Sequence, residues 1–144
     1  MNSAEFTPAP LDVVCRIVAG DLPSEVVWRD ADLVAFLDHR PVFKGHVLVC
    51  PARHVTNLPE LPDDLVAPLF TLVRRVGVAM TEAFGAQGSF TGINTTISQS
   101  IPHLHVHVIP RSRGDGLRGF FWPRVRYAEA EAAEYAGRLR AALR

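Results

Sequence analysis

Several features that would place a protein in a special class are missing from this 144-residue sequence. No apolar run approaches the ~20 residues of a membrane-spanning helix, so we expect no membrane partner. Two cysteines, Cys15 and Cys50, are too few for a disulfide framework, which favours a cytoplasmic protein. The first residues lack the basic and apolar stretches of a secretory signal, which agrees with that location.

The formal net charge is zero, since 15 basic residues balance 15 acidic ones. A neutral chain argues against a broad basic surface, so we expect no nucleic-acid partner. Hydrophobic residues make up 48% and charged residues 21%, which is the balance of a globular protein. The length suits a single domain, which we expect over residues 11–144 after a mobile N-terminal lead-in over residues 1–10.

Hydrophobic periodicity predicts a short helix, three strands, a long helix, two strands and a final helix. The first helix should be capped by Asp12 and ended by Gly20, and the others should cover residues 64–84 and 128–143. Pro68 requires the long helix to begin just before it or to bend there. The expected strands cover residues 25–28, 33–37, 46–50, 90–97 and 103–109. Strands in series with few helical crossovers favour an α+β domain with an antiparallel sheet.

The segment from His103 to Ile109 carries the strongest chemical signal in the sequence. In a strand, side chains two residues apart share a face, so His103, His105 and His107 would form one row. The apolar residues between them would face the core. The alternative is a polar strand face exposed to solvent. The apolar flanks argue against it, and a half-buried row of imidazoles needs hydrogen-bond partners or a chemical role.

Two chemical roles fit such a row. Imidazoles two residues apart can bind Zn²⁺, or one neutral imidazole can attack phosphorus while its neighbours donate hydrogen bonds. Gln99 and Ser100 add donors just before the row, and residues 111–126 add five arginines against one acid, which suits an anionic ligand. A zinc hydrolase would more often show a carboxylate beside the row, and its absence there favours covalent catalysis.

Residues 103–109 match the His-φ-His-φ-His-φ-φ signature of the histidine triad superfamily, where φ is an apolar residue. Further segments resemble this family along nearly the whole chain: residues 15–23, 36–38, 45–54 and 99–100. The resemblance implies an antiparallel sheet of about five strands with one long packed helix. It also implies a homodimer of the Hint/Fhit-like type.

The activity that the resemblance implies is cleavage at the α-phosphate of a nucleoside phosphoramidate, ester or dinucleoside polyphosphate, with purine nucleotides as the usual substrates and no cofactor in catalysis. His105 would be the nucleophile and would carry the nucleotidyl group. His107 and Ser100 would donate hydrogen bonds, while His103 and His46 would orient the array. The substrate-binding residues would be Ile17, Phe36, Asp38, Asn94, Gln99 and Trp122.

The resemblance also points to a structural zinc site. Some members bind Zn²⁺ through a Cys-x-x-Cys pair, a later histidine and the first histidine of the triad. Here Asp12 stands at the first cysteine position, so the candidate ligands are Asp12, Cys15, His54 and His103. A second departure from the family is Ser98, which stands where many members have glycine.

Two other functions stay open on the sequence. The chain could be a nucleotide-binding interaction protein with little turnover, since the fold would be the same. It could also be a Zn-dependent hydrolase that uses the triad as metal ligands, and activity that survives a chelator would exclude this alternative.

Overall fold

The computed structural model describes residues 12–117 and 123–143. This part of the chain forms two compact units, one that ends at Arg113 and one that begins at Gly114. The expected lead-in over residues 1–10 and the candidate contact Trp122 lie outside the described residues. The single domain over residues 11–144 stays a prediction. Among the described residues, no helix is both long and apolar enough to cross a membrane.

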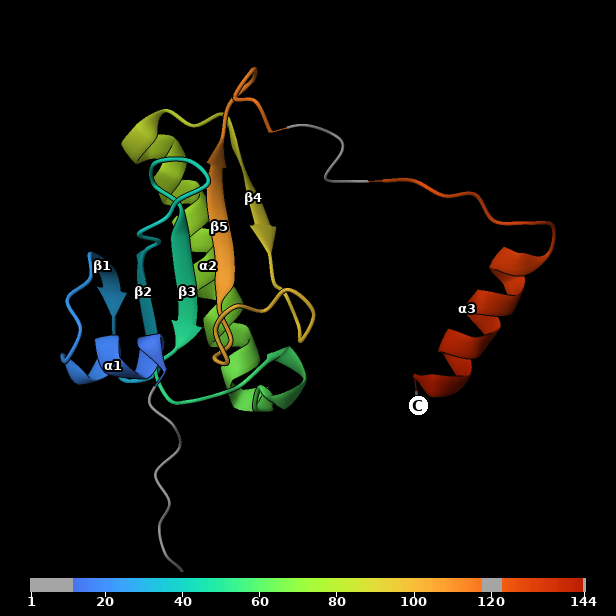
Figure 1. Cartoon of the computed structure of the whole chain (residues 1–144), viewed down its shortest axis with the longest axis horizontal. Helices are drawn as coiled ribbons and strands as arrows, with labels where there is room; N and C mark the ends of the chain where they lie inside the picture. The colour runs from blue at the N-terminus through green and yellow to red at the C-terminus, as the bar shows by residue number, and fades with distance from the viewer. Residues whose placement is uncertain (1–11, 118–122, 144) are drawn as a thin grey trace, which may run out of the picture. The chain divides into compact units, whose positions relative to one another are not determined.

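The first unit is built on an antiparallel sheet with the strand order β1-β2-β3-β5-β4 (Figure 1). Its strands are β1 (Val26–Arg29), β2 (Leu33–Leu37), β3 (Val47–Pro51), β4 (Gly88–Gly92) and β5 (Val106–Arg111). A long helix, α2 (Asp63–Phe84), covers one face and lies behind the sheet in Figure 1. The short helices are α1 (Val13–Ala19) and the 3₁₀ turn η1 (Leu58–Glu60), and the second unit holds α3 (Glu131–Ala142). The α+β class with one long packed helix is confirmed.

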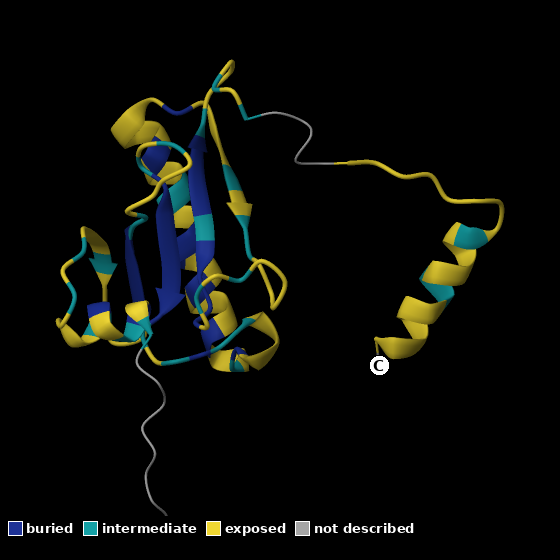
Figure 2. Cartoon of the chain, viewed as in Figure 1, coloured by how far each residue is buried: buried dark blue, intermediate teal, exposed yellow. Residues whose placement is uncertain are grey.

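Alternating side chains divide the apolar residues into two layers. One layer lies between the sheet and α2 and includes Leu104, Val106 and Val108. The other layer packs against α1: Val14, Ile17, Val34, Phe36, Leu48 and Cys50. Strands β2, β3 and β5 are therefore the most deeply buried part of the unit (Figure 2). The expected alternation around the triad is confirmed, because its apolar residues face α2.

Helix ends follow the predicted capping residues. Asp12 Oδ1 accepts a hydrogen bond from the Cys15 N–H at 2.8 Å, and Gly20 closes α1 with a φ of 81°. Helix α2 begins at Asp63 and contains Pro68 in its second turn. Pro68 is exposed and has no N–H to donate to the Asp64 carbonyl four residues before it.

The last two strands differ from the prediction at their ends. Strand β4 covers Gly88–Gly92 rather than residues 90–97, and the φ values of 66° at Thr96 and 62° at Ser98 are incompatible with a strand that reaches residue 97. Strand β5 begins at Val106 rather than at residue 103, since β3 ends in Pro51, which has no N–H to extend the ladder beyond the Val49–Val106 pair. The first two triad histidines therefore precede the strand.

Candidate active site

A row of side chains crosses the sheet on the face opposite α2. Phe36 pairs with Leu48, Leu48 with His107, and His107 with Gly92, so these residues stand side by side on neighbouring strands. Ile17 of α1 packs in the same apolar layer as Phe36 and Leu48. The predicted base-contacting residues Ile17 and Phe36 therefore lie on the face that carries His107, and Leu48 is a member of this row that the sequence analysis missed.

Backbone groups fix the proton positions on His46 and His107. The Val42 N–H donates to His46 Nδ1 at 3.1 Å, so the His46 proton is on Nε2. His46 Nε2 donates to His107 Nδ1 at 2.9 Å, which leaves the His107 proton on Nε2. His107 therefore offers an N–H donor on the ring edge that faces away from His46, as the expected role of the third triad histidine requires.

The surroundings keep both imidazoles neutral. Burial lowers the pKa of His107 to about 4, and the neighbouring His105 and His46 rings contribute to the shift. Burial also lowers the pKa of His46, against the opposing effect of the Asp38 carboxylate. Gly45, which precedes His46, has a φ of 97° and must be glycine, because a Cβ there would lie 2.5 Å from the Phe84 ring.

We expect the free energy of unfolding to fall as the pH is lowered from about 6.5 to about 4. The unfolded chain binds more protons in this window, because the pKa of His107 is low only in the folded state. Replacing His107 with asparagine should remove about 1–2 kcal/mol of this pH dependence, after allowance for partial solvent exposure. Urea titrations of both proteins at about pH 4.5 and 7.5 measure the effect. An equal stability loss in both would contradict it.

His105 has the geometry of a nucleophile. Its Nδ1 lies 2.7 Å from the carbonyl oxygen of His103, and a carbonyl only accepts, so the proton is on Nδ1. The Nε2 lone pair is then available in the neutral ring. The side chain is 3% exposed, and its ring centroid lies 5.0 Å from that of His107. A free lone pair and a neighbouring N–H donor therefore lie on adjacent imidazoles.

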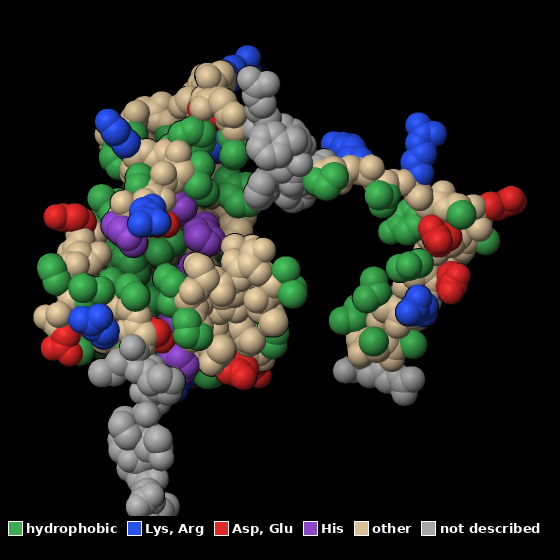
Figure 3. Space-filling model, viewed as in Figure 1, with side chains coloured by type: hydrophobic (Ala, Val, Ile, Leu, Met, Phe, Trp, Pro, Cys, Tyr) green, Lys and Arg blue, Asp and Glu red, His purple; other side chains and the backbone are tan. Residues whose placement is uncertain are grey.

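The other predicted site residues surround this pair. Asp38 lies at the end of β2, where its Oδ2 is 3.8 Å from His46 Nδ1 and its Oδ1 accepts from the Arg40 N–H at 2.9 Å. Asn94 lies two residues beyond Gly92, the partner of His107 in β4. Ser100 is exposed in the loop between β4 and β5. Histidine side chains (purple) lie beside basic ones (blue) on the face drawn in Figure 3.

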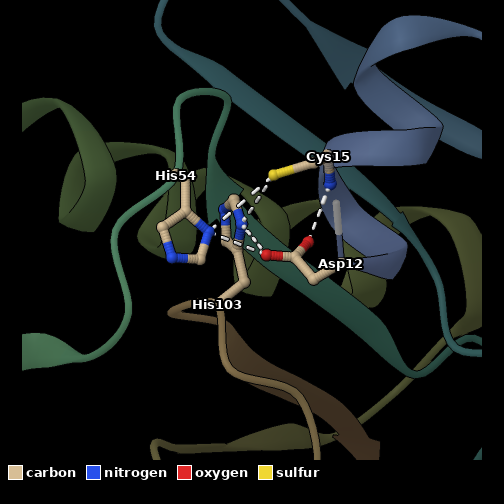
Figure 4. Close-up of side chains that lie close together, drawn as sticks. All are labelled: Asp12, Cys15, His54 and His103. Carbon is tan, nitrogen blue, oxygen red and sulfur yellow. Dashed lines mark hydrogen bonds and ion pairs between the residues drawn. The ribbon is translucent and has the colours of Figure 1, made fainter. Parts of the chain in front are cut away.

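His103 faces a second cluster together with Asp12, Cys15 and His54 (Figure 4). Asp12 Oδ2 lies 2.8 Å from His54 Nδ1 and 3.0 Å from His103 Nδ1. Cys15 Sγ lies 3.8 Å and 3.6 Å from the same two nitrogens. The structure thus brings together all four candidate metal ligands that the sequence suggests, from α1, the loop after β3 and the segment before β5.

This donor set fits a tetrahedral Zn²⁺ ion. Zinc ligands at ordinary bond lengths lie about 3.3–3.6 Å from one another, close to the separations found here. His103 Nε2 donates to the Pro51 carbonyl at 2.8 Å, so His103 Nδ1 is unprotonated in the neutral ring and free to bind a metal. Burial raises the pKa of Asp12, but the hydrogen bond from the Cys15 N–H opposes this effect and the pKa is lowered overall, so this ligand is ionised.

A sequence model of the HIT domain matches residues 19–114. The chain belongs to the HIT domain family. An adenosine 5'-monophosphoramidase of Schizosaccharomyces pombe is 35% identical to this HIT protein over 77% of this chain and 82% of the relative. An asymmetrical bis(5'-nucleosyl)-tetraphosphatase of the same yeast is 39% identical over 64% of this chain, and the match spans 52% of that relative.

A solved structure of a zinc-bound family member shares the fold. The zinc-bound histidine triad family protein of Mycobacterium smegmatis superposes with a TM-score of 0.70 and 32% identity, covering 90% of this chain and 96% of that chain. The expected membership of the histidine triad family, with its five-stranded antiparallel sheet, is therefore confirmed.

Proposed function

We propose that this HIT protein is an enzyme that cleaves nucleotides at the α-phosphate through a covalent nucleotidyl group on His105. The observation that carries this proposal is the pair of fixed tautomers, a lone pair on His105 Nε2 beside an N–H on His107 Nε2. The names of the two yeast relatives support a phosphoramidate or a dinucleoside polyphosphate as substrate. Purine nucleotides are the bases that we expect.

In the first step, His105 Nε2 attacks the α-phosphorus as the bond to the leaving group breaks. The Nε2–H of His107 donates a hydrogen bond to the departing nitrogen or oxygen, and the leaving group takes its proton from water. The carbonyl of His103 accepts from His105 Nδ1 at 2.7 Å and so stabilises the positive charge that develops on the attacking ring. Water then attacks the nucleotidyl-His105 and loses a proton to solvent, and the bond between phosphorus and Nε2 breaks, which releases the nucleoside monophosphate and restores the neutral imidazole.

The remaining predicted residues bind the substrate in this scheme. Asp38 accepts hydrogen bonds from the ribose hydroxyls, and Ile17 and Phe36 contact the base. Ser100 and Asn94 donate to phosphate oxygens from the loop that follows β4. Trp122 stays a candidate contact on the strength of the family resemblance.

The geometry favours covalent catalysis over a zinc hydrolase that uses the triad as ligands. His103 points to the cluster with Asp12, whereas His107 is hydrogen-bonded to His46. His105 Nδ1 is occupied by the His103 carbonyl. No cluster of potential metal ligands among the described residues contains all three triad histidines.

The test is hydrolysis of a substrate panel in ¹⁸O-labelled water. Adenosine phosphoramidates and dinucleoside polyphosphates should yield AMP that carries the label, because water opens the bond between phosphorus and His105. An unlabelled AMP would show attack at another atom. Tight nucleotide binding with negligible turnover across the panel would instead favour a nucleotide-binding interaction protein.

We further propose that Asp12, Cys15, His54 and His103 hold a structural Zn²⁺ ion. Such an ion would supply a fixed link between α1, the loop after β3 and the triad segment. Cys15 would bind as the thiolate, although burial and the Asp12 charge raise its pKa in the metal-free protein. His103 would then be held at its side chain by the metal cluster while its carbonyl accepts from His105.

A homodimer is the expected assembly, and we propose that its interface lies at β4 and the exposed face of α2. Strand β4 is an edge of the sheet, and Val66 and Phe70 of α2 are apolar yet 42% and 38% exposed. Gly77, on the same side of α2, lies against Ser89 of β4. Edge strand β4 and the apolar face of α2 are therefore neighbours. Both cysteines are unpaired, which agrees with the expected cytoplasmic location.

Replacing Phe70 with glutamate should convert the dimer to a monomer, because two charges would be buried without partners at a symmetric interface. Sedimentation equilibrium measures the change in mass. The matched control is Val27→Glu at the opposite edge of the sheet, where valine is 52% exposed and the dimer should persist. A dimer that survives Phe70→Glu and dissociates with Val27→Glu would place the interface at β1 instead.

A further inference from the structure

The side chain of Gln99 forms hydrogen bonds that fix the loop between β4 and β5. Its Oε1 accepts from the Thr96 N–H at 2.9 Å, and its Nε2 donates to the carbonyls of Thr56 at 2.6 Å and Ile101 at 3.0 Å. Carbonyls only accept and backbone N–H groups only donate, so the orientation of this amide is fixed. Both amide hydrogens are therefore used inside the protein.

The loop that Gln99 holds has a strained backbone. Thr96 and Ser98 have φ values of 66° and 62°, in the left-handed region that favours glycine. The Ile97 N–H donates to the Thr95 carbonyl at 2.7 Å, which closes a three-residue turn centred on Thr96. With a positive φ at its centre, this is the rarer and more strained form of γ-turn.

Packing does not hold the tip of this loop in place, since Ile97 is 80% exposed. A strained conformation persists only where surrounding contacts determine it. The three hydrogen bonds of Gln99 provide such contacts, because they join the strained turn at Thr96 to the segment that contains Thr56.

The same hydrogen bonds fix the residue that follows Gln99. The amide reaches from residue 99 to the carbonyl of Ile101 and so spans Ser100, while Ile101 itself packs against the apolar layer around Phe36. Ser100 is therefore held on both sides by its neighbours in the chain, whereas its own side chain is exposed.

We propose that Gln99 is a positioning residue that holds the strained loop so that Ser100 faces the α-phosphate. This inference rests on the proposed function, and it replaces the expected direct contact between Gln99 and substrate. The oxygen of the amide would repel an anionic phosphate, and its nitrogen has no free hydrogen unless a bond to Thr56 or Ile101 breaks.

The test compares Gln99→Ala with wild type in three measurements. The kcat should fall about 10- to 100-fold, because a misplaced donor weakens transition-state binding. The KM and the affinity for AMP should change less than about 3-fold, since the ground state loses no contact. Amide exchange at Thr96 should accelerate at least about 10-fold, because this N–H loses its acceptor.

Two further variants separate positioning from general damage. Gln87→Ala removes a glutamine whose Oε1 accepts from the Arg113 N–H at 2.7 Å at the far end of β4, and it should keep the wild-type kcat. Ser98→Gly in the Gln99→Ala background should restore part of the lost kcat, because glycine reaches a φ of 62° without a side-chain penalty.

A different result would overturn the inference. If Gln99→Ala weakens AMP binding more than about 10-fold, leaves Thr96 exchange unchanged and gains nothing from Ser98→Gly, then Gln99 contacts the substrate directly. A wild-type protein with no turnover on any substrate would instead refute the proposed function. The AMP affinity and the Thr96 exchange rate would still decide the role of Gln99 in that case.

Discussion

Replacing His105 with asparagine should lower kcat at least about 10⁴-fold, because the change removes the only atom proposed to attack phosphorus. Asparagine keeps an N–H donor that can reach the His103 carbonyl, which His105 contacts at 2.7 Å. It lacks a nitrogen lone pair in place of Nε2. The fold and the affinity for AMP should therefore survive while turnover is lost.

The measurement pairs steady-state kinetics with a search for the covalent intermediate. Wild type mixed with a slow substrate and quenched in acid-free denaturant should gain the mass of one nucleotidyl group, and His105→Asn should not. The matched control is His39→Asn, since the His39 side chain is 89% exposed. Turnover by His105→Asn at more than about 1% of the wild-type rate would rule out His105 as the nucleophile.

Local periodicity made part of this site predictable. The alternation of histidine with Leu104, Val106 and Val108 predicts which side chains face the core, and all three lie in the layer against α2. The start of β5 was not predictable in the same way, because it depends on where β3 ends in Pro51. A strand pairs with a distant segment, so its boundaries follow from residues that a local pattern does not contain.

The chemistry of the histidines also depends on groups that have no side-chain signature. The tautomers of His46 and His105 are fixed by the Val42 N–H and the His103 carbonyl, which every residue type possesses. The role of Gln99 also depends on backbone groups that the sequence pattern does not reveal. Its position before the triad suggests a substrate contact, whereas its three hydrogen bonds go to backbone atoms of residues 56, 96 and 101.

The cluster of Asp12, Cys15, His54 and His103 was predictable because these residue types and their spacing resemble a pattern of the family. Replacing a cysteine ligand with Asp12 could have abolished metal binding at this site. Instead, the two oxygens of Asp12 have different partners. Oδ1 accepts a hydrogen bond from the Cys15 N–H at 2.8 Å, and Oδ2 faces the imidazoles of His54 and His103. One residue thus caps α1 and completes the donor set, which a cysteine would do less well because its sulfur is a weak acceptor.

Removing zinc should therefore lower the Tm by about 10 °C, which corresponds to the loss of about 3–4 kcal/mol in a domain of this size. The reason is that the proposed ion would join Asp12 to His103 across 91 positions of the chain and would neutralise a carboxylate that is 3% exposed. Elemental analysis should find about one zinc per chain. Calorimetry before and after treatment with a chelator, followed by zinc replacement, measures the change in Tm.

Asp12→Asn separates the two roles of this residue, because the amide oxygen can still cap α1 while the ligand charge is lost. This variant should bind zinc at least about 10-fold more weakly, and its Tm should respond less to the chelator than the wild-type Tm does. The matched control is Cys50→Ala, which removes a thiol buried in the apolar layer and should keep its zinc. If neither chelator nor added zinc changes the wild-type Tm, the contacts among Asp12, Cys15, His54 and His103 hold α1 without a metal.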